Sequence, residues 1–343
     1  MGLPETSAAT LHATAKPIKG FVSWHNFRMH FPKDTVLTRT LTLAERRLET
    51  QLLHYDGLDW RAYTYAWRDD QTDADLVAAD GAEREIKVGD QKRLWQFQSR
   101  SQCLICHNNQ SQYALAFEPA QLNCSIDGKD QLAVLTEEGF VQRVDNTGKP
   151  LPPFDAKSVA AEVKLAEPAD QNQSLEARAR AYLHANCGHC HSEHGGGAVA
   201  VRFGFPTAVA DMKAVDVKPQ RGDFGLPEAR IIKPGDPYAS TLYFRMAKHG
   251  RDRMPHIGSE IPDEAGLELI ARWIASLKSD EVIRFIVDAD SPLTDPREAL
   301  FLARKLGRGE LKTPQREQLL ASAAKLPAGL TRDLFEGYFP DDP

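Results

Sequence analysis

The sequence predicts an α+β multidomain protein with an antiparallel β-rich N-terminal domain, then an all-α domain, then a short helical segment. Three observations lead to this prediction. The 343 residues exceed the usual length of one domain. Alternating apolar and polar residues are typical of strands and dominate the first hundred positions, whereas apolar residues at helical spacing dominate the second half. The predicted domains cover residues 1–168, 169–280 and 281–343.

The first part of the chain is predicted to form strands, because β-branched and aromatic residues are frequent there. The predicted strands cover residues 35–41, 47–55 and 58–67. Asp56 and Gly57 separate the last two and are a typical pair for a hairpin turn. Three aromatic residues of the last strand share one face and are expected in the sheet core: Tyr63, Tyr65 and Trp67.

Helices are predicted at 131–140 and, mainly, after a polar stretch at 167–173 that is typical of a linker. Ser174 is the expected N-cap of a helix that leads into Cys187. Asp263 is the expected N-cap of a second helix, whose apolar face comprises Leu267, Ile270, Trp273, Ile274 and Leu277. Three short helices are predicted for the C-terminal appendage or connector, at 296–306, 314–326 and 331–338.

Charge argues against nucleic acid as a partner, and hydropathy argues against a membrane-spanning segment. The chain has 42 Lys and Arg against 48 Asp and Glu, with no long run of one sign, so nucleic acid is not an expected partner. No apolar stretch approaches the roughly 18 residues that a membrane-spanning helix needs. Residues 1–19 lack the apolar core of a secretory signal peptide, so we expect any such leader to be absent from this chain.

Four of the five cysteines form two copies of the pattern Cys-x-x-Cys-His. This pattern is the attachment signature of c-type haem. Its two thiols add to the vinyl groups of the haem, and its histidine is the proximal ligand of the iron. Because the pattern occurs twice, the sequence predicts two covalently bound haems. The predicted attachment and ligand residues are Cys103, Cys106 and His107 for the first haem, and Cys187, Cys190 and His191 for the second.

Other uses of these cysteines fit the spacing less well. Paired cysteines of a structural zinc site usually lie within about 20 residues of each other, whereas these pairs are about 80 residues apart. A thiol-oxidoreductase motif needs a strand before it, but the residues before Cys187 have helical spacing. A disulfide within each pair would be strained and would leave both histidines without a role. Cys124 has no obvious mate and is interpreted as a small buried apolar residue.

A low-spin haem needs a second axial ligand, usually Met or His. For the second haem, Met254 is the predicted ligand, because it lies in a loop before the closing helix; His249, His256 and a role for Met254 as core filler are alternatives. For the first haem, neither Met nor His follows at ordinary spacing. The remaining candidates are His25, Met29, His30 and His54, a residue of the other haem domain, or an open position that would bind a small ligand or peroxide.

Several segments resemble a family of bacterial dihaem c-type cytochromes that are encoded beside, or fused to, quinoprotein (PQQ) sugar dehydrogenases of the sorbosone type. In the first half these segments are FPKDTVL (31–37), RLETQLL (47–53), YAW (65–67), QTDA (71–74) and QLN (121–123). In the second half they are NCGHCH (186–191), PGDP (234–237) and RMPHIG (253–258). The resemblance covers residues 31–278. It implies electron transfer and, with the helix before Cys187, a class I cytochrome c-like fold for the all-α domain.

The expected function is electron transfer outside the cytoplasm, for example in the periplasm, from a quinoprotein dehydrogenase to a downstream cytochrome or oxidase. Transient docking on small surfaces suits such redox partners. Two alternatives stay open. One is a dihaem enzyme of the peroxidase type, in which the first haem is the open reaction centre. The other is a sensor whose first haem binds a gas.

Overall fold

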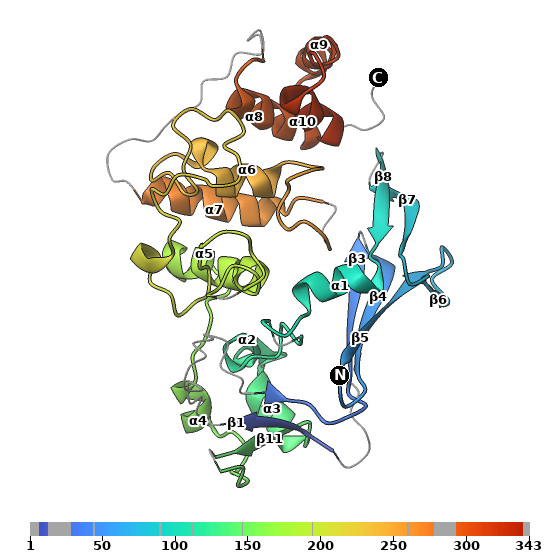
Figure 1. Cartoon of the computed structure of the whole chain (residues 1–343), viewed down its shortest axis with the longest axis vertical. Helices are drawn as coiled ribbons and strands as arrows, with labels where there is room; N and C mark the ends of the chain where they lie inside the picture. Colours follow the sequence, from blue (N-terminus) through green and yellow to red (C-terminus); the bar gives the residue numbers. More distant parts are fainter. Residues whose placement is uncertain are drawn as a thin grey trace. The chain divides into compact units, whose positions relative to one another are not determined.

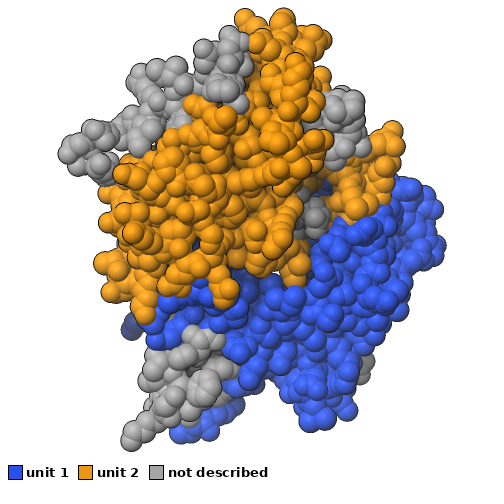
Figure 2. All heavy atoms as spheres, turned by 45° about the horizontal axis from the view of Figure 1, so that its top comes forward, with its two compact units in different colours: residues 1–84, 96–173, 180–206 blue, residues 85–95, 174–179, 207–343 orange. Residues whose placement is uncertain are grey.

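The computed structural model describes residues 7–12, 29–43, 45–88, 91–111, 113–145, 147–193, 195–258, 261–277 and 293–338. The chain divides into two compact units, which Figure 2 shows in different colours. Unit 1 comprises residues 1–84, 96–173 and 180–206, and unit 2 comprises residues 85–95, 174–179 and 207–343. The units therefore interleave along the chain, whereas the predicted domains are consecutive. The division at 168 and 280 stays a prediction.

An antiparallel four-stranded sheet forms one part of unit 1 (Figure 1). Its strands follow the chain order: β3 (Val36–Leu43), β4 (Arg46–Tyr55), β5 (Trp60–Trp67) and β6 (Ala74–Leu76). The predicted hairpin is confirmed, since β4 and β5 pair in register from Glu49 with Ala66 to Tyr55 with Trp60. The Asp56 carboxylate accepts hydrogen bonds from the backbone of the turn, and Gly57 has φ +97°, a conformation that glycine adopts without strain.

The buried face of strand β5 is not the predicted one. Trp60, Ala62 and Thr64 are buried, whereas the three aromatic residues Tyr63, Tyr65 and Trp67 are only half-buried on the other face. The predicted aromatic core is therefore wrong. The Arg47 guanidinium lies 3.6 Å from the centre of the Trp67 ring, so this face is covered partly by a cation instead of by apolar side chains.

A second part of unit 1 contains short strands and helices. β1 (Ala9–His12) pairs in parallel with β11 (Val141–Val144) and antiparallel with β2 (Met29–His30). The remaining elements of this part are β9 (Ser125–Ile126), β10 (Lys129–Asp130), α2 (Pro119–Leu122), α3 (Gln131–Glu137) and α4 (Ala156–Ala161). Helix α1 (Arg100–Cys106) instead packs against strand β5 of the four-stranded sheet. The predicted helix at 131–140 is confirmed as α3. An apolar cluster around Leu11, Leu122, Leu132 and Phe154 joins β1, β11, α2, α3 and α4.

Three elements include residues of both units: β7 (Ala82–Val88), β8 (Gln91–Phe97) and α5 (Leu175–Leu183). The predicted cap of α5 is confirmed, because the Ser174 hydroxyl accepts a hydrogen bond from the Ala177 N–H at 3.2 Å. The chain then continues as a π-helical turn, η1 (His184–Gly188), which contains the first cysteine of the second motif. Such π-helical turns are frequent at functional sites.

Unit 2 is mainly helical. Its further elements are η2 (Val209–Asp211), η3 (Pro237–Ala239), α6 (Thr241–Ala247), α7 (Glu264–Ser276), α8 (Pro296–Gly307), α9 (Thr313–Ala323) and α10 (Leu330–Tyr338). The Asp263 carboxylate caps α7 by accepting from the Gly266 N–H at 3.0 Å, which confirms the predicted start of that helix. The three predicted C-terminal helices are confirmed as α8, α9 and α10. Within the described part of the chain, no helix is both long and apolar enough to cross a bilayer.

The predicted all-α domain of the class I cytochrome c type at 169–280 is wrong, and the structure is a mixed α+β chain. Residues 180–206 belong to the same compact unit as the β-sheet. Between η1 and α6 the chain is mostly irregular and forms isolated parallel bridges, Val215 with Ile232 and Arg230 with Ser240. The physical reason is the density of Gly and Pro at 195–197, 203–206 and 233–237, which interrupts helices.

Candidate functional site

Helix α1 carries the first Cys-x-x-Cys-His motif and lies against strand β5 (Figure 1). A capping box fixes its start: the Ser99 hydroxyl accepts from the Gln102 N–H at 3.1 Å, and the Gln102 side chain accepts from the Ser99 N–H at 2.8 Å. Cys103 and Cys106 are three residues apart and therefore lie on neighbouring positions of one helix face. Cys103 packs against the apolar cluster of the sheet, which anchors this face.

His107 follows the last residue of α1 and has a defined tautomer. Its Nδ1 lies 2.5 Å from the backbone oxygen of Tyr113. A carbonyl oxygen only accepts, so Nδ1 carries the proton and Nε2 keeps its lone pair. Burial lowers the pKa of His107, which favours the neutral ring. A neutral imidazole whose second nitrogen donates to a backbone carbonyl is the usual form of a metal-ligating histidine.

A short loop after the helix holds this carbonyl in place. The Ser111 hydroxyl donates to the backbone oxygen of Cys106, and the Asn108 N–H donates to the Ser111 hydroxyl at 3.1 Å. The Asn108 side-chain oxygen accepts from the Ser111 N–H at 3.1 Å in return. Tyr113 stacks on Trp60 of the sheet, with ring centres 6.4 Å apart. The orientation of the His107 ring is therefore set by a loop that is tied to both the helix and the sheet.

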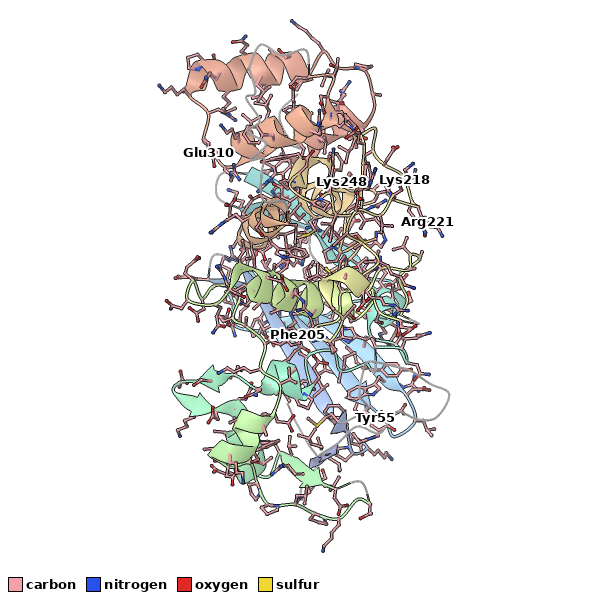
Figure 3. The ribbon with its side chains drawn as sticks, turned by 90° about the vertical axis from the view of Figure 1, so that its left-hand side faces the viewer. Tyr55, Phe205, Lys218, Arg221, Lys248 and Glu310 are labelled. Carbon is pink, nitrogen blue, oxygen red and sulfur yellow. The ribbon has the colours of Figure 1, made fainter. Side chains whose placement is uncertain are left out.

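The second motif is held by His184, which is buried in the π-helical turn. Its Nε2 donates to the Glu118 carboxylate, and its Nδ1 accepts from the backbone N–H of Phe205 at 3.2 Å. Phe205 is labelled in Figure 3. Glu118 follows the first motif in the sequence, so this pair ties the second motif to the segment that leaves the first.

Three glycines fold back over the end of the second motif. A Cβ atom on Gly195 would lie 2.3 Å from the Cys190 backbone oxygen, and one on Gly197 would lie 2.9 Å from Nδ1 of His191. A Cβ atom on Gly196 would meet nothing closer than 3.9 Å. The Gly197 N–H also donates to the Cys190 oxygen at 2.9 Å. At Gly195 and Gly197 the backbone therefore lies too close to Cys190 and His191 to leave space for a side chain, whereas Gly196 has that space.

The two motifs meet in unit 1. The ligand atoms of Cys106, His189 and Cys190 all lie within 4.8 Å of one another, and no other such group of three occurs among the described residues. Hydrogen bonding between the two thiols raises the pKa of Cys106 and lowers the pKa of Cys190. Burial raises the pKa of Cys187 to about 12. Cys103 and Cys187 are half-buried, and Cys106 and Cys190 are paired with each other. This donor set suits soft metals and covalent haem attachment.

The predicted axial ligands have different surroundings. Met254 belongs to unit 2 and His191 to unit 1, so its role as a ligand stays a prediction. Met29 packs against the apolar cluster that includes Leu11. His54 lies 3.5 Å from the Asp34 carboxylate. His30 is exposed in β2, and His25 lies outside the described residues.

Cys124 is not the buried apolar residue that we expected. It is half-buried, and its thiol donates to the Gln131 side chain at 3.0 Å. Sequence reasoning also missed His189, one of the two variable residues of the second motif, and the pair of the buried His184 with Glu118. A histidine inside a haem motif was a visible signal for the first. Nothing local links residues 118 and 184, so the pair had no sequence signal.

Comparisons with known proteins add no relative. No family model, curated protein or solved structure matches this chain.

Proposed function

We propose that this chain is an electron-transfer protein that carries two covalently attached c-type haems. The attachment residues are Cys103 and Cys106 for the first haem, and Cys187 and Cys190 for the second. His107 and His191 are the proximal ligands. When bound, each haem supplies an iron that alternates between the ferric and the ferrous state.

The observation that carries this proposal is the hydrogen bond from Nδ1 of His107 to the Tyr113 oxygen. It lies beside two thiols on one helix face, and it leaves the lone pair on Nε2, the nitrogen that can bind a metal. Burial keeps the ring neutral, as a ligand must be. In the second motif, the close approach of Gly197 limits the positions open to the His191 ring. Both sites thus suit an imidazole held in one orientation under a metal.

A zinc site is the competing interpretation of the same cysteines. The group of Cys106, His189 and Cys190 would give zinc three ligands and leave a fourth position open. That arrangement would give no role to Cys103 or Cys187. It would also not explain why a histidine directly follows each cysteine pair. Haem attachment uses all four thiols and both histidines, so we favour it.

The partners follow from the resemblance described above. We propose that electrons come from a dehydrogenase with a quinone cofactor and leave to another cytochrome or an oxidase, outside the cytoplasm. Leu104 and Ile105, between the two cysteines of the first motif, expose 37% and 57% of their surface. Apolar surface beside an electron-transfer centre is suited to brief contact with a partner over a small area.

A redox titration of the protein, produced with haem-ligation machinery, tests this function. We expect two irons that are reduced and reoxidised reversibly, and no turnover of hydrogen peroxide. The double variant Cys103→Ser with Cys106→Ser should keep one redox-active iron, whereas the control variant Cys124→Ser should keep both. Peroxide turnover by the intact protein would instead support the dihaem enzyme. A protein that contains zinc and no haem would exclude both functions.

A further inference from the structure

We infer that Cys106 and Cys190 mark the place where the two haems meet, so that electrons pass directly from one haem to the other within unit 1. This inference rests on the proposed function, because it needs both haems to be attached. It adds that the second cysteine of each motif faces the second cysteine of the other. The haems then act as one coupled pair and not as two separate carriers.

Contacts between the two motifs support this arrangement. The sulfur atoms of Cys106 and Cys190 lie within 4.8 Å of each other, and the His189 ring completes the group. The Asn108 amide lies 3.9 Å from where a Cβ atom of Gly196 would stand, so the loops that follow the two motifs lie near each other.

Both motifs are anchored independently of this contact. The capping box at Ser99 and the packing of Cys103 on the sheet fix α1. The bond from His184 to Glu118 fixes the π-helical turn of the second motif to the segment after the first. Packing and hydrogen bonds elsewhere in unit 1 therefore help to position both sulfurs. The hydrogen bond between the two thiols adds to these contacts.

The distance between the two sulfurs sets an upper limit on the separation of the two haem edges, because each sulfur is bonded covalently to its haem. In a c-type haem, each cysteine sulfur is two covalent bonds from the conjugated ring. With bond lengths of about 1.5–1.8 Å, the two ring edges then lie no more than about 11 Å apart. Tunnelling rates fall steeply with edge separation, so a short gap favours direct transfer. In that step the ferrous iron of one haem is oxidised as the ferric iron of the other is reduced, and no bond or proton changes.

Electron paramagnetic resonance of the full chain with both haems tests the inference. We expect the signals of the two ferric irons to be coupled. During a reductive titration, the lines of the iron that is still ferric should change shape as its neighbour becomes diamagnetic. Lines that match two isolated irons at every stage would overturn the inference. A haem content of two per chain would still leave the proposed function intact in that case, whereas a chain without haem fails the proposed function itself.

Redox titration of single-haem variants gives a second, independent result. The variants are Cys103→Ser with Cys106→Ser, and Cys187→Ser with Cys190→Ser. Two unit charges about 15–20 Å apart, at an effective dielectric constant of about 20, change an equilibrium constant roughly four- to sixfold. The redox titration curves of the intact protein and of Cys124→Ser should therefore both span a wider range of potential than the curve obtained by adding those of the two single-haem variants. Superimposable curves would contradict the pairing. If a variant does not fold, the resonance measurement on the intact protein decides alone.

Discussion

Replacing Gly197 by alanine should disturb the second motif, because the loop there leaves no space for a side chain. The new Cβ atom would lie 2.9 Å from Nδ1 of His191 and 3.0 Å from the Cys190 backbone oxygen. Either the loop or the imidazole must move. Gly196 is the matched control, since a Cβ atom at that position has no neighbour closer than 3.9 Å.

The expected difference follows from two opposing effects. Alanine reduces the freedom of the unfolded chain and stabilises by about 0.4–1 kcal/mol where it fits. Neither glycine has the positive φ that would make alanine strained. Steric crowding in a packed site costs about 1–3 kcal/mol, and only Gly197→Ala incurs it. We therefore expect the unfolding free energy of Gly197→Ala to be about 1–3 kcal/mol lower than that of Gly196→Ala.

Urea unfolding of both variants near neutral pH, followed by far-ultraviolet circular dichroism, measures this difference. The visible spectrum of one haem should also shift in Gly197→Ala and stay unchanged in Gly196→Ala. Equal stabilities and equal spectra would show that the loop does not confine His191, and the reasoning from close approach would be refuted.

Three further predictions concern single side chains. Ser111→Ala should lower the unfolding free energy by about 1–3 kcal/mol in a urea titration, since the Cys106 oxygen loses its donor; an unchanged midpoint would contradict this. His184→Ala should cost about 2–4 kcal/mol in the same assay, because a buried ring is lost and the Phe205 N–H loses its acceptor; a cost below about 1 kcal/mol would count against the anchor. Burial and nearby cations lower the pKa of His249 from 6.5 to about 3, so the unfolded chain binds its proton more readily and stability falls as the pH drops from about 6.5 toward 3. His249→Gln should make the unfolding free energy less dependent on pH by about 1–2 kcal/mol between neutral pH and pH 5, and an identical pH profile would exclude this role.

Turn and capping residues in the sequence correctly predicted where a hairpin turns and where two helices begin. Asp56 and Gly57 located the hairpin turn, and Ser174 and Asp263 located the starts of α5 and α7. Each of these signals acts through hydrogen bonds or backbone angles within a few residues. The face of strand β5 was not predicted correctly, because an arginine stacked on Trp67 makes an aromatic face compatible with partial exposure.

The packing of segments that lie far apart in the sequence could not be predicted from such local signals. The all-α domain was expected from two helices and a motif, yet the Gly- and Pro-rich segments between them form bridges and irregular chain. The contact between Cys106 and Cys190 joins positions about 80 residues apart, and neither motif carries a residue that specifies the other as its neighbour. The motifs therefore lead to a prediction of chemistry, which the experiments above test, whereas their juxtaposition required the fold.

The intact mass of the protein, made in a host with haem-ligation machinery, tests the central claim most directly. We expect the polypeptide mass plus two haems, and one haem fewer when Cys187 and Cys190 are both replaced by serine. A denatured chain that runs at its bare polypeptide mass and lacks Soret absorption would contradict the account.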